Sequence, residues 1–80
     1  MSEEAISELI RRKLSHGDLP AAWPKMTWGG KSSGLETVCA ACDVPIPEGD
    51  VLIEVNYPGG SLRSFHPICA NLVAVICGAL

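Results

Sequence analysis

The sequence predicts one small α+β domain, in which a helix precedes a loop, a tight turn, a β-hairpin and a second helix. Apolar residues recur with helical spacing near the N-terminus, alternate between positions 51 and 57, and dominate positions 67 to 80. The chain has 80 residues, which suffices for one domain but not for a large hydrophobic core. A chain of this size usually needs disulfides, a bound metal or a partner for stability.

Composition narrows the class of protein. Apolar residues make up 48% and charged residues 19%, which indicates a globular rather than a disordered chain. The formal charge of −3 disfavours a general nucleic-acid binder. No apolar run reaches the roughly 18 residues of a membrane helix. The first residues, Met1 to Glu4, lack the pattern of a signal peptide, so we expect a cytoplasmic protein.

Residues 1–17 are expected to form an amphipathic helix over positions 3–16. Ser2 is a suitable N-cap, and Glu3 and Glu4 follow in the first turn, where the helix dipole favours negative charge. Gly17 should end the helix, and the basic run 11–13 before it is interpreted as a solvated helix end rather than a phosphate contact. The apolar stripe consists of Ile6, Leu9, Ile10 and Leu14.

Residues 18–37 are rich in glycine and proline and are expected to form a loop that packs on the rest of the domain. A loop of this length in a small domain must pack or carry a function. Trp23, Met26 and Trp28 lie within it. We interpret the tryptophans as covering the edge of the core, in preference to a hot spot for partner binding.

Residues 38–80 should contain the turn, the hairpin and the last helix. Positions 51–57 alternate as in a half-buried strand, a turn follows at 57–61, and 62–65 should return as the second strand. Pro67 suits the first position of a helix, with His66 as its N-cap. Positions 67–80 carry no charge, so this helix needs cover from the first helix, the hairpin and a further surface.

Three cysteines and one histidine form two closely spaced pairs. Cys39 and Cys42 make a C-x2-C pair, and His66 and Cys69 make an H-x2-C pair 23 residues further on. Two such pairs supply the four tetrahedral ligands of a structural zinc site, with no position left open for water. The sequence therefore predicts one zinc ion bound by these four residues. Cys77 falls outside the pattern and is expected to be a small apolar residue of the last helix.

Other interpretations of the cysteines remain. Two disulfides would suit a secreted protein, for which no export signal is present. A redox dithiol of Cys39 and Cys42 would need a strand–helix unit that the sequence does not indicate. A Cys–His nucleophile, an iron–sulfur centre or another metal are further alternatives. Haem attachment is excluded, because Asp43 and not histidine follows the second cysteine.

The pattern C-x2-C-x23-H-x2-C resembles that of treble-clef zinc fingers. Its spacing is similar to the first zinc module of LIM domains and, with a shorter interval, to the finger of poly(ADP-ribose) polymerases. Ile46 and Gly49 after the first pair, and Phe65 before His66, match residues that are common in those families. The resemblance covers residues 38–77 and implies the same four metal ligands. The helix, Leu19-Pro20, Trp28-Gly29-Gly30 and Gly34 ahead of the finger also resemble short bacterial single-finger proteins, and this resemblance brings no known activity.

These observations predict a zinc-stabilised interaction module and not an enzyme. A filled zinc site cannot activate water, and its histidine is a ligand. We expect a protein partner or a second copy to bind the last helix and the tryptophan loop. Nucleic-acid binding is the alternative, because the first helix could form a small basic patch with Lys25 and Lys31. Beyond Leu35, however, the chain has five acidic residues and Arg63 as its only lysine or arginine, which is too little positive charge for a phosphate backbone.

Overall fold

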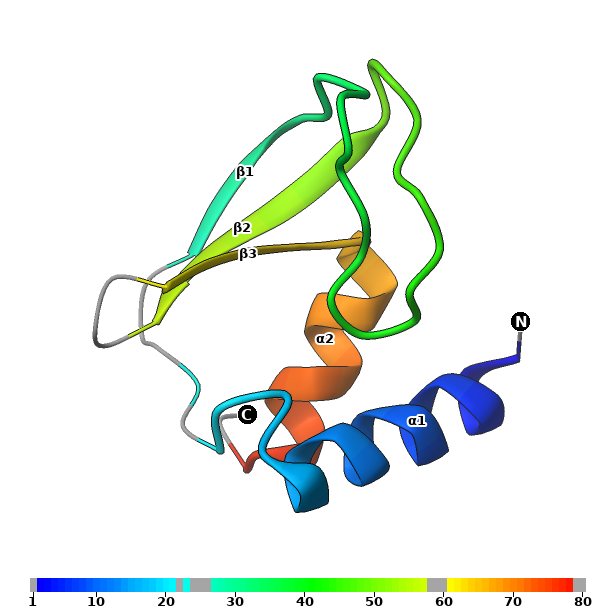
Figure 1. Cartoon of the computed structure of the whole chain (residues 1–80), viewed down its shortest axis with the longest axis vertical. Helices are drawn as coiled ribbons and strands as arrows, with labels where there is room; N and C mark the ends of the chain where they lie inside the picture. Colours follow the sequence, from blue (N-terminus) through cyan, green and yellow to red (C-terminus); the bar gives the residue numbers. More distant parts are fainter. Residues whose placement is uncertain (1, 22, 24–26, 58–60, 79–80) are drawn as a thin grey trace.

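The computed structural model describes residues 2–21, 23, 27–57 and 61–78. The chain forms helix α1 (Glu3–His16), strands β1 (Thr27–Lys31), β2 (Val51–Tyr57) and β3 (Ser61–Phe65), and helix α2 (Pro67–Ile76). The strands make one antiparallel sheet in the order β1-β2-β3. Helix α2 lies between the sheet and α1 and contacts both (Figure 1). The described residues do not include Lys25, Met26, the predicted turn at 58–60 or Leu80.

Helix α1 has the predicted bounds and caps. The Ser2 hydroxyl accepts a hydrogen bond from the Ala5 N–H at 3.2 Å, which satisfies one of the free donors of the first turn. Gly17 ends the helix in the left-handed conformation, with φ of 78°. Ile6 and Ile10 are buried in the core, so the predicted apolar stripe is the face that packs on α2.

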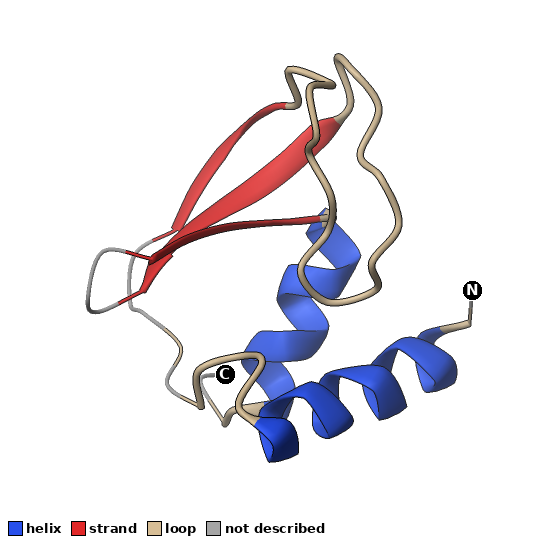
Figure 2. Cartoon of the chain, in the orientation of Figure 1, coloured by secondary structure: helices blue, strands red, loops and turns tan. Residues whose placement is uncertain are grey.

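Strand β1 corrects the prediction that residues 18–37 are a loop. It pairs antiparallel with β2, from Thr27 opposite Val55 to Lys31 opposite Val51. The predicted hairpin is therefore two strands of a three-stranded sheet (Figure 2). Every residue of β1 is exposed or half-exposed, and two of the five are glycine. Such a strand has no buried face, so it leaves no period-two pattern in the sequence.

The two tryptophans lie in different surroundings. The ring of Trp23 packs against those of Tyr57 and Phe65, at centroid distances of 6.4 Å and 5.8 Å. This residue covers the edge of the core, as predicted. Trp28 lies on β1 with 51% of its surface exposed, so the same prediction is wrong for Trp28.

Helix α2 begins as predicted and ends early. His66 is the N-cap and Pro67 the first helical residue. The helix stops at Ile76 rather than running to position 80, and Gly78 adopts φ of 76° just beyond it. A glycine in this conformation is a common helix terminator. The side chains of α2 that enter the core are Cys69, Ala70, Val73 and Ala74.

One face of α2 stays uncovered by the described residues. Ile68 and Val75, seven positions apart, are 49% and 54% exposed. The sheet and α1 cover the other faces, as the sequence predicted. Among the helices described, none is both long enough and apolar enough to pass through a bilayer.

Candidate metal centre

The first cysteine pair lies in a tight turn between β1 and β2. The turn closes through two backbone hydrogen bonds, from the Asp43 N–H to the Cys39 carbonyl at 3.0 Å and from the Cys39 N–H to the Val44 carbonyl at 3.1 Å. Asp43 adopts the left-handed conformation with φ of 63°, which aspartate tolerates better than most residues. This reversal places the thiols of Cys39 and Cys42 in one cluster.

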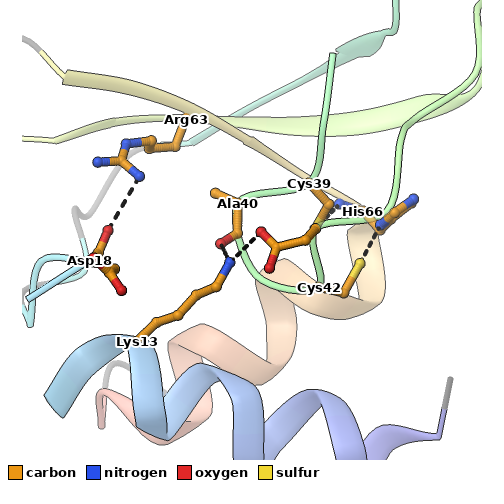
Figure 3. A network of polar contacts seen from close by, with 8 residues as sticks. Lys13, Asp18, Cys39, Ala40, Cys42, Arg63 and His66 are labelled. Carbon is orange, nitrogen blue, oxygen red and sulfur yellow. Dashed lines mark hydrogen bonds and ion pairs between the residues drawn. The ribbon is translucent and has the colours of Figure 1, made fainter. Parts of the chain in front are cut away.

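The second pair lies where β3 passes into α2. His66 caps the helix in an extended conformation and makes no side-chain cap hydrogen bond. Its Nδ1 instead faces the thiols of Cys42 and Cys69, and Figure 3 shows the contact with Cys42. Cys69 lies in the first turn of α2, so both side chains of this pair reach the same place. The backbone N–H of His66 points to the Cys39 thiol at 3.5 Å.

The four ligand atoms lie at distances that suit a single ion. All of them are within 4.8 Å of one another. The Nδ1 of His66 is 3.4 Å from the sulfur of Cys42 and 3.9 Å from that of Cys69. A tetrahedral zinc with Zn–S of about 2.3 Å and Zn–N of about 2.0 Å has S···N edges of about 3.5 Å. The cluster could therefore hold one metal ion.

The surroundings of the thiols disfavour a reactive nucleophile. Cys39, Cys42 and Cys69 are buried and His66 is half-buried. Burial raises the pKa of the Cys42 thiol and, more strongly, the pKa of the Cys69 thiol. A reactive thiol needs the opposite shift. A bound cation would favour the thiolates, because its charge outweighs the cost of burying theirs.

Lys13 ties α1 to the cysteine turn. Its Nζ donates to the Ala40 carbonyl at 2.8 Å and forms an ion pair with the Asp43 carboxylate at 2.5 Å (Figure 3). The Lys13 side chain is only 14% exposed, so the interpretation of this residue as part of a solvated helix end is wrong. A sequence signal was present. Lys13 lies three positions after Ile10, on the edge of the apolar stripe.

The residues predicted as metal ligands are the ones that the fold brings together: Cys39, Cys42, His66 and Cys69. Cys77 is not part of this cluster and is half-buried at the end of α2. Comparison with protein-family models finds no match, and comparisons with curated proteins and with solved structures find none either. Fold and site together define a small α+β domain with a candidate metal site of three cysteines and one histidine.

Proposed function

We propose that the four clustered residues bind one structural zinc ion and that the domain is a treble-clef-like zinc finger. The observation that carries this proposal is the buried cluster of three sulfurs and one ring nitrogen within 4.8 Å. Thiolate and imidazole ligands select zinc among the common divalent ions when the geometry is tetrahedral. The order of turn, strands and ligand-bearing helix supports the treble-clef assignment.

The ion would stabilise the fold rather than catalyse a reaction. Four protein ligands fill a tetrahedral site and leave no position for water or substrate. The ion would join the Cys39–Cys42 turn to the start of α2, which are otherwise connected by few polar contacts. In a chain of 80 residues this cross-link supplies stability that a small core cannot. Cysteines that bind zinc or stay reduced, with no disulfide between them, suit a reducing compartment, and we propose that the protein lies in the cytoplasm.

The role that we assign to the stabilised fold is binding of a protein, either a partner or a second copy. Its support is the uncovered face of α2, with Ile68 and Val75 half exposed. Nucleic-acid binding has less support, because Lys13 is engaged by Ala40 and Asp43.

Native mass spectrometry of protein purified from zinc-containing medium tests the metal proposal. We expect the mass of one zinc ion per chain, lost on treatment with a chelator. The Cys69→Ser variant should lose the ion, whereas Cys77→Ser, which changes a cysteine outside the cluster, should retain it. Wild-type protein that folds without a metal would contradict the proposal.

Light scattering on size-exclusion fractions tests self-association. We expect a dimer or larger oligomer at high concentration, and Val75→Glu should give a monomer that retains the metal. Val51→Glu is the matched control, since Val51 is as exposed as Val75 but lies on β2 and not on the uncovered face of α2. A wild-type monomer at high concentration would exclude self-association and leave a different protein as the partner. Loss of metal in Val75→Glu would show that this side chain supports the core instead.

A further inference from the structure

We propose that the cleft between the Cys39–Cys42 turn and strand β3 binds an extended, basic segment of a partner protein. The inference rests on the proposed function, because the turn that forms one wall carries two of the metal ligands. The cleft has a volume of about 780 Å³ and opens to solvent. The lining residues that decide its chemistry are Lys13, Asp18, Glu36, Val38, Leu62 and Arg63.

One wall of the cleft is an open strand edge. The Ser64 carbonyl accepts a hydrogen bond from the Ala40 N–H at 2.9 Å, so the backbone groups of Ser64 point away from β2. Backbone direction alternates along a strand, and Leu62 therefore points its N–H and C=O the same way. Because β3 is the last strand of the sheet, Leu62 presents these groups to the cleft.

The opposite wall presents a second backbone edge. Two hydrogen bonds, Cys39 N–H to Val44 and Ile46 N–H to Thr37, flank the bridge between Val38 and Pro45. The N–H and C=O of Val38 consequently point away from Pro45, toward the side on which Ala40 reaches β3.

The two walls converge at one point and separate beyond it. In the described part of the chain, the bond between Ala40 and Ser64 is the one backbone hydrogen bond that joins them. From there the chain runs back to Val38 on one wall and to Leu62 on the other, and both residues line the cleft. An extended peptide can pair with such edges by strand addition.

The side chains at the cleft define the peptide. Val38 and Leu62 are exposed aliphatic residues on facing walls, which suits small apolar side chains at alternate peptide positions. The two cations are already engaged: Lys13 by Ala40 and Asp43, and Arg63 Nη1 by the Asp18 carbonyl at 3.3 Å.

The carboxylates at the cleft remain open to solvent. Asp18 and Glu36 are exposed, and the Asp43 side chain is 64% exposed although it pairs with Lys13. The proposed zinc ion with its three thiolates would add a further net negative charge beside this wall. The field in the cleft therefore favours lysine or arginine at the peptide positions between the apolar ones.

Titration of isotope-labelled, zinc-loaded protein with a capped pentapeptide of alternating lysine and valine tests the proposal. We expect amide shifts at Val38, Leu62 and Ser64, and weaker binding when salt is raised from about 50 mM to about 300 mM. The same peptide with glutamate for lysine should not bind. A version with N-methylated valines should also fail, because it lacks the N–H donors for strand pairing.

Variants that remove negative charges test whether the carboxylates of the cleft attract the peptide. Asp18→Asn combined with Glu36→Gln should weaken peptide binding by about five- to tenfold, as expected for two partly screened charges. Glu8→Gln, on the exposed face of α1, should leave the affinity unchanged. The proposal is overturned if the acidic or N-methylated peptide binds equally well, if the shifts cluster on α2, or if no shifts appear at millimolar peptide. The zinc content of the same sample is measured as well. If zinc is bound and the peptide still fails these tests, the peptide proposal is wrong and the metal proposal stands.

Discussion

The segment 38–50, which carries two of the four candidate metal ligands, has little regular structure, yet it contributes four residues to the core, whereas strand β1 contributes none. Between positions 38 and 50 the structure has an isolated bridge between Val38 and Pro45 and otherwise turns and irregular chain. Its core residues are Cys39, Ala41, Cys42 and Ile46. Strand β1 is a regular ladder, but none of its residues is buried. In this chain, a regular strand therefore adds nothing to the core, whereas an irregular segment supplies several core residues.

The difference lies in what holds each segment. The irregular segment is anchored to several elements. Among these anchors, the Ser32 hydroxyl donates to the Ile46 carbonyl at 2.7 Å, and Lys13 reaches the turn from α1. Strand β1 pairs with β2 along one edge only. We therefore expect changes in the irregular segment and its anchors to cost much more stability than changes in β1.

Cys39→Ser should have the largest effect. It removes a buried ligand, and the free energy of metal binding is free energy of folding in such sites. We expect loss of the metal and unfolding of residues 38–77, followed by loss of α1 packing. Far-ultraviolet circular dichroism and amide proton dispersion measure this. A native-like spectrum of the metal-free variant would contradict the structural role of the ion.

Two glycines provide a matched pair for the same comparison. Gly34, before the irregular segment, has φ of 79°, and a Cβ there would lie 2.8 Å from the Cβ of Glu48. Gly34→Ala should cost about 2–4 kcal/mol from backbone strain and overlap. Gly29 on β1 has open space, and Gly29→Ala should change stability by less than about 0.5 kcal/mol. Urea unfolding checks both values, and equal effects would refute the contrast between the two regions.

Lys13→Met should have an intermediate effect. It leaves the Ala40 carbonyl without its charged donor and Asp43 without its ion pair. Because Asp43 is largely exposed, most of the expected loss of about 1–2 kcal/mol comes from the carbonyl. We also expect faster release of metal to a colorimetric chelator. Arg12→Met, an exposed neighbour on α1, is the control, and equal release rates would show that Lys13 does not hold the turn closed.

Tyr57→Phe should have a small effect near neutral pH. The Tyr57 hydroxyl is buried and has no hydrogen-bond partner among the described residues, so its removal should leave stability unchanged or raise it by up to about 1 kcal/mol. Burial raises the pKa of Tyr57 from 10.0 to about 12. The folded state therefore holds this proton more tightly than the unfolded state. The free energy of unfolding keeps this stabilisation below pH 10 and loses it as the pH rises toward about 12.

Urea unfolding at pH values on both sides of this window tests the tyrosine prediction. Wild-type protein should lose more stability across the window than Tyr57→Phe, because the variant lacks the titrating hydroxyl. An identical loss in both proteins would assign the pH dependence to other groups.

Elements with a local pattern were predictable from the sequence. Helix α1 shows its caps and stripe, β2 alternates, and the two ligand pairs have the spacing of a metal site. Strand β1 was not predictable, because Gly29 and Gly30 on an exposed edge leave no pattern. The partner of Lys13 is 27 residues away, and such a contact depends on how α1 docks. Gly78 was a sequence signal for the early end of α2. The prediction extended the helix to position 80 instead, because positions 67–80 are almost entirely apolar.

The attachment of α1 to the cysteine turn has a consequence for the life of the protein in a cell. If the cluster binds zinc as we propose, a chain made without zinc cannot form the turn to which Lys13 donates its hydrogen bond. The apolar side chains of Ile6 and Ile10 would then lose their cover and become accessible to proteases that degrade unfolded segments. The half-life of the protein would follow zinc supply, so its abundance would record metal sufficiency without any change in its synthesis.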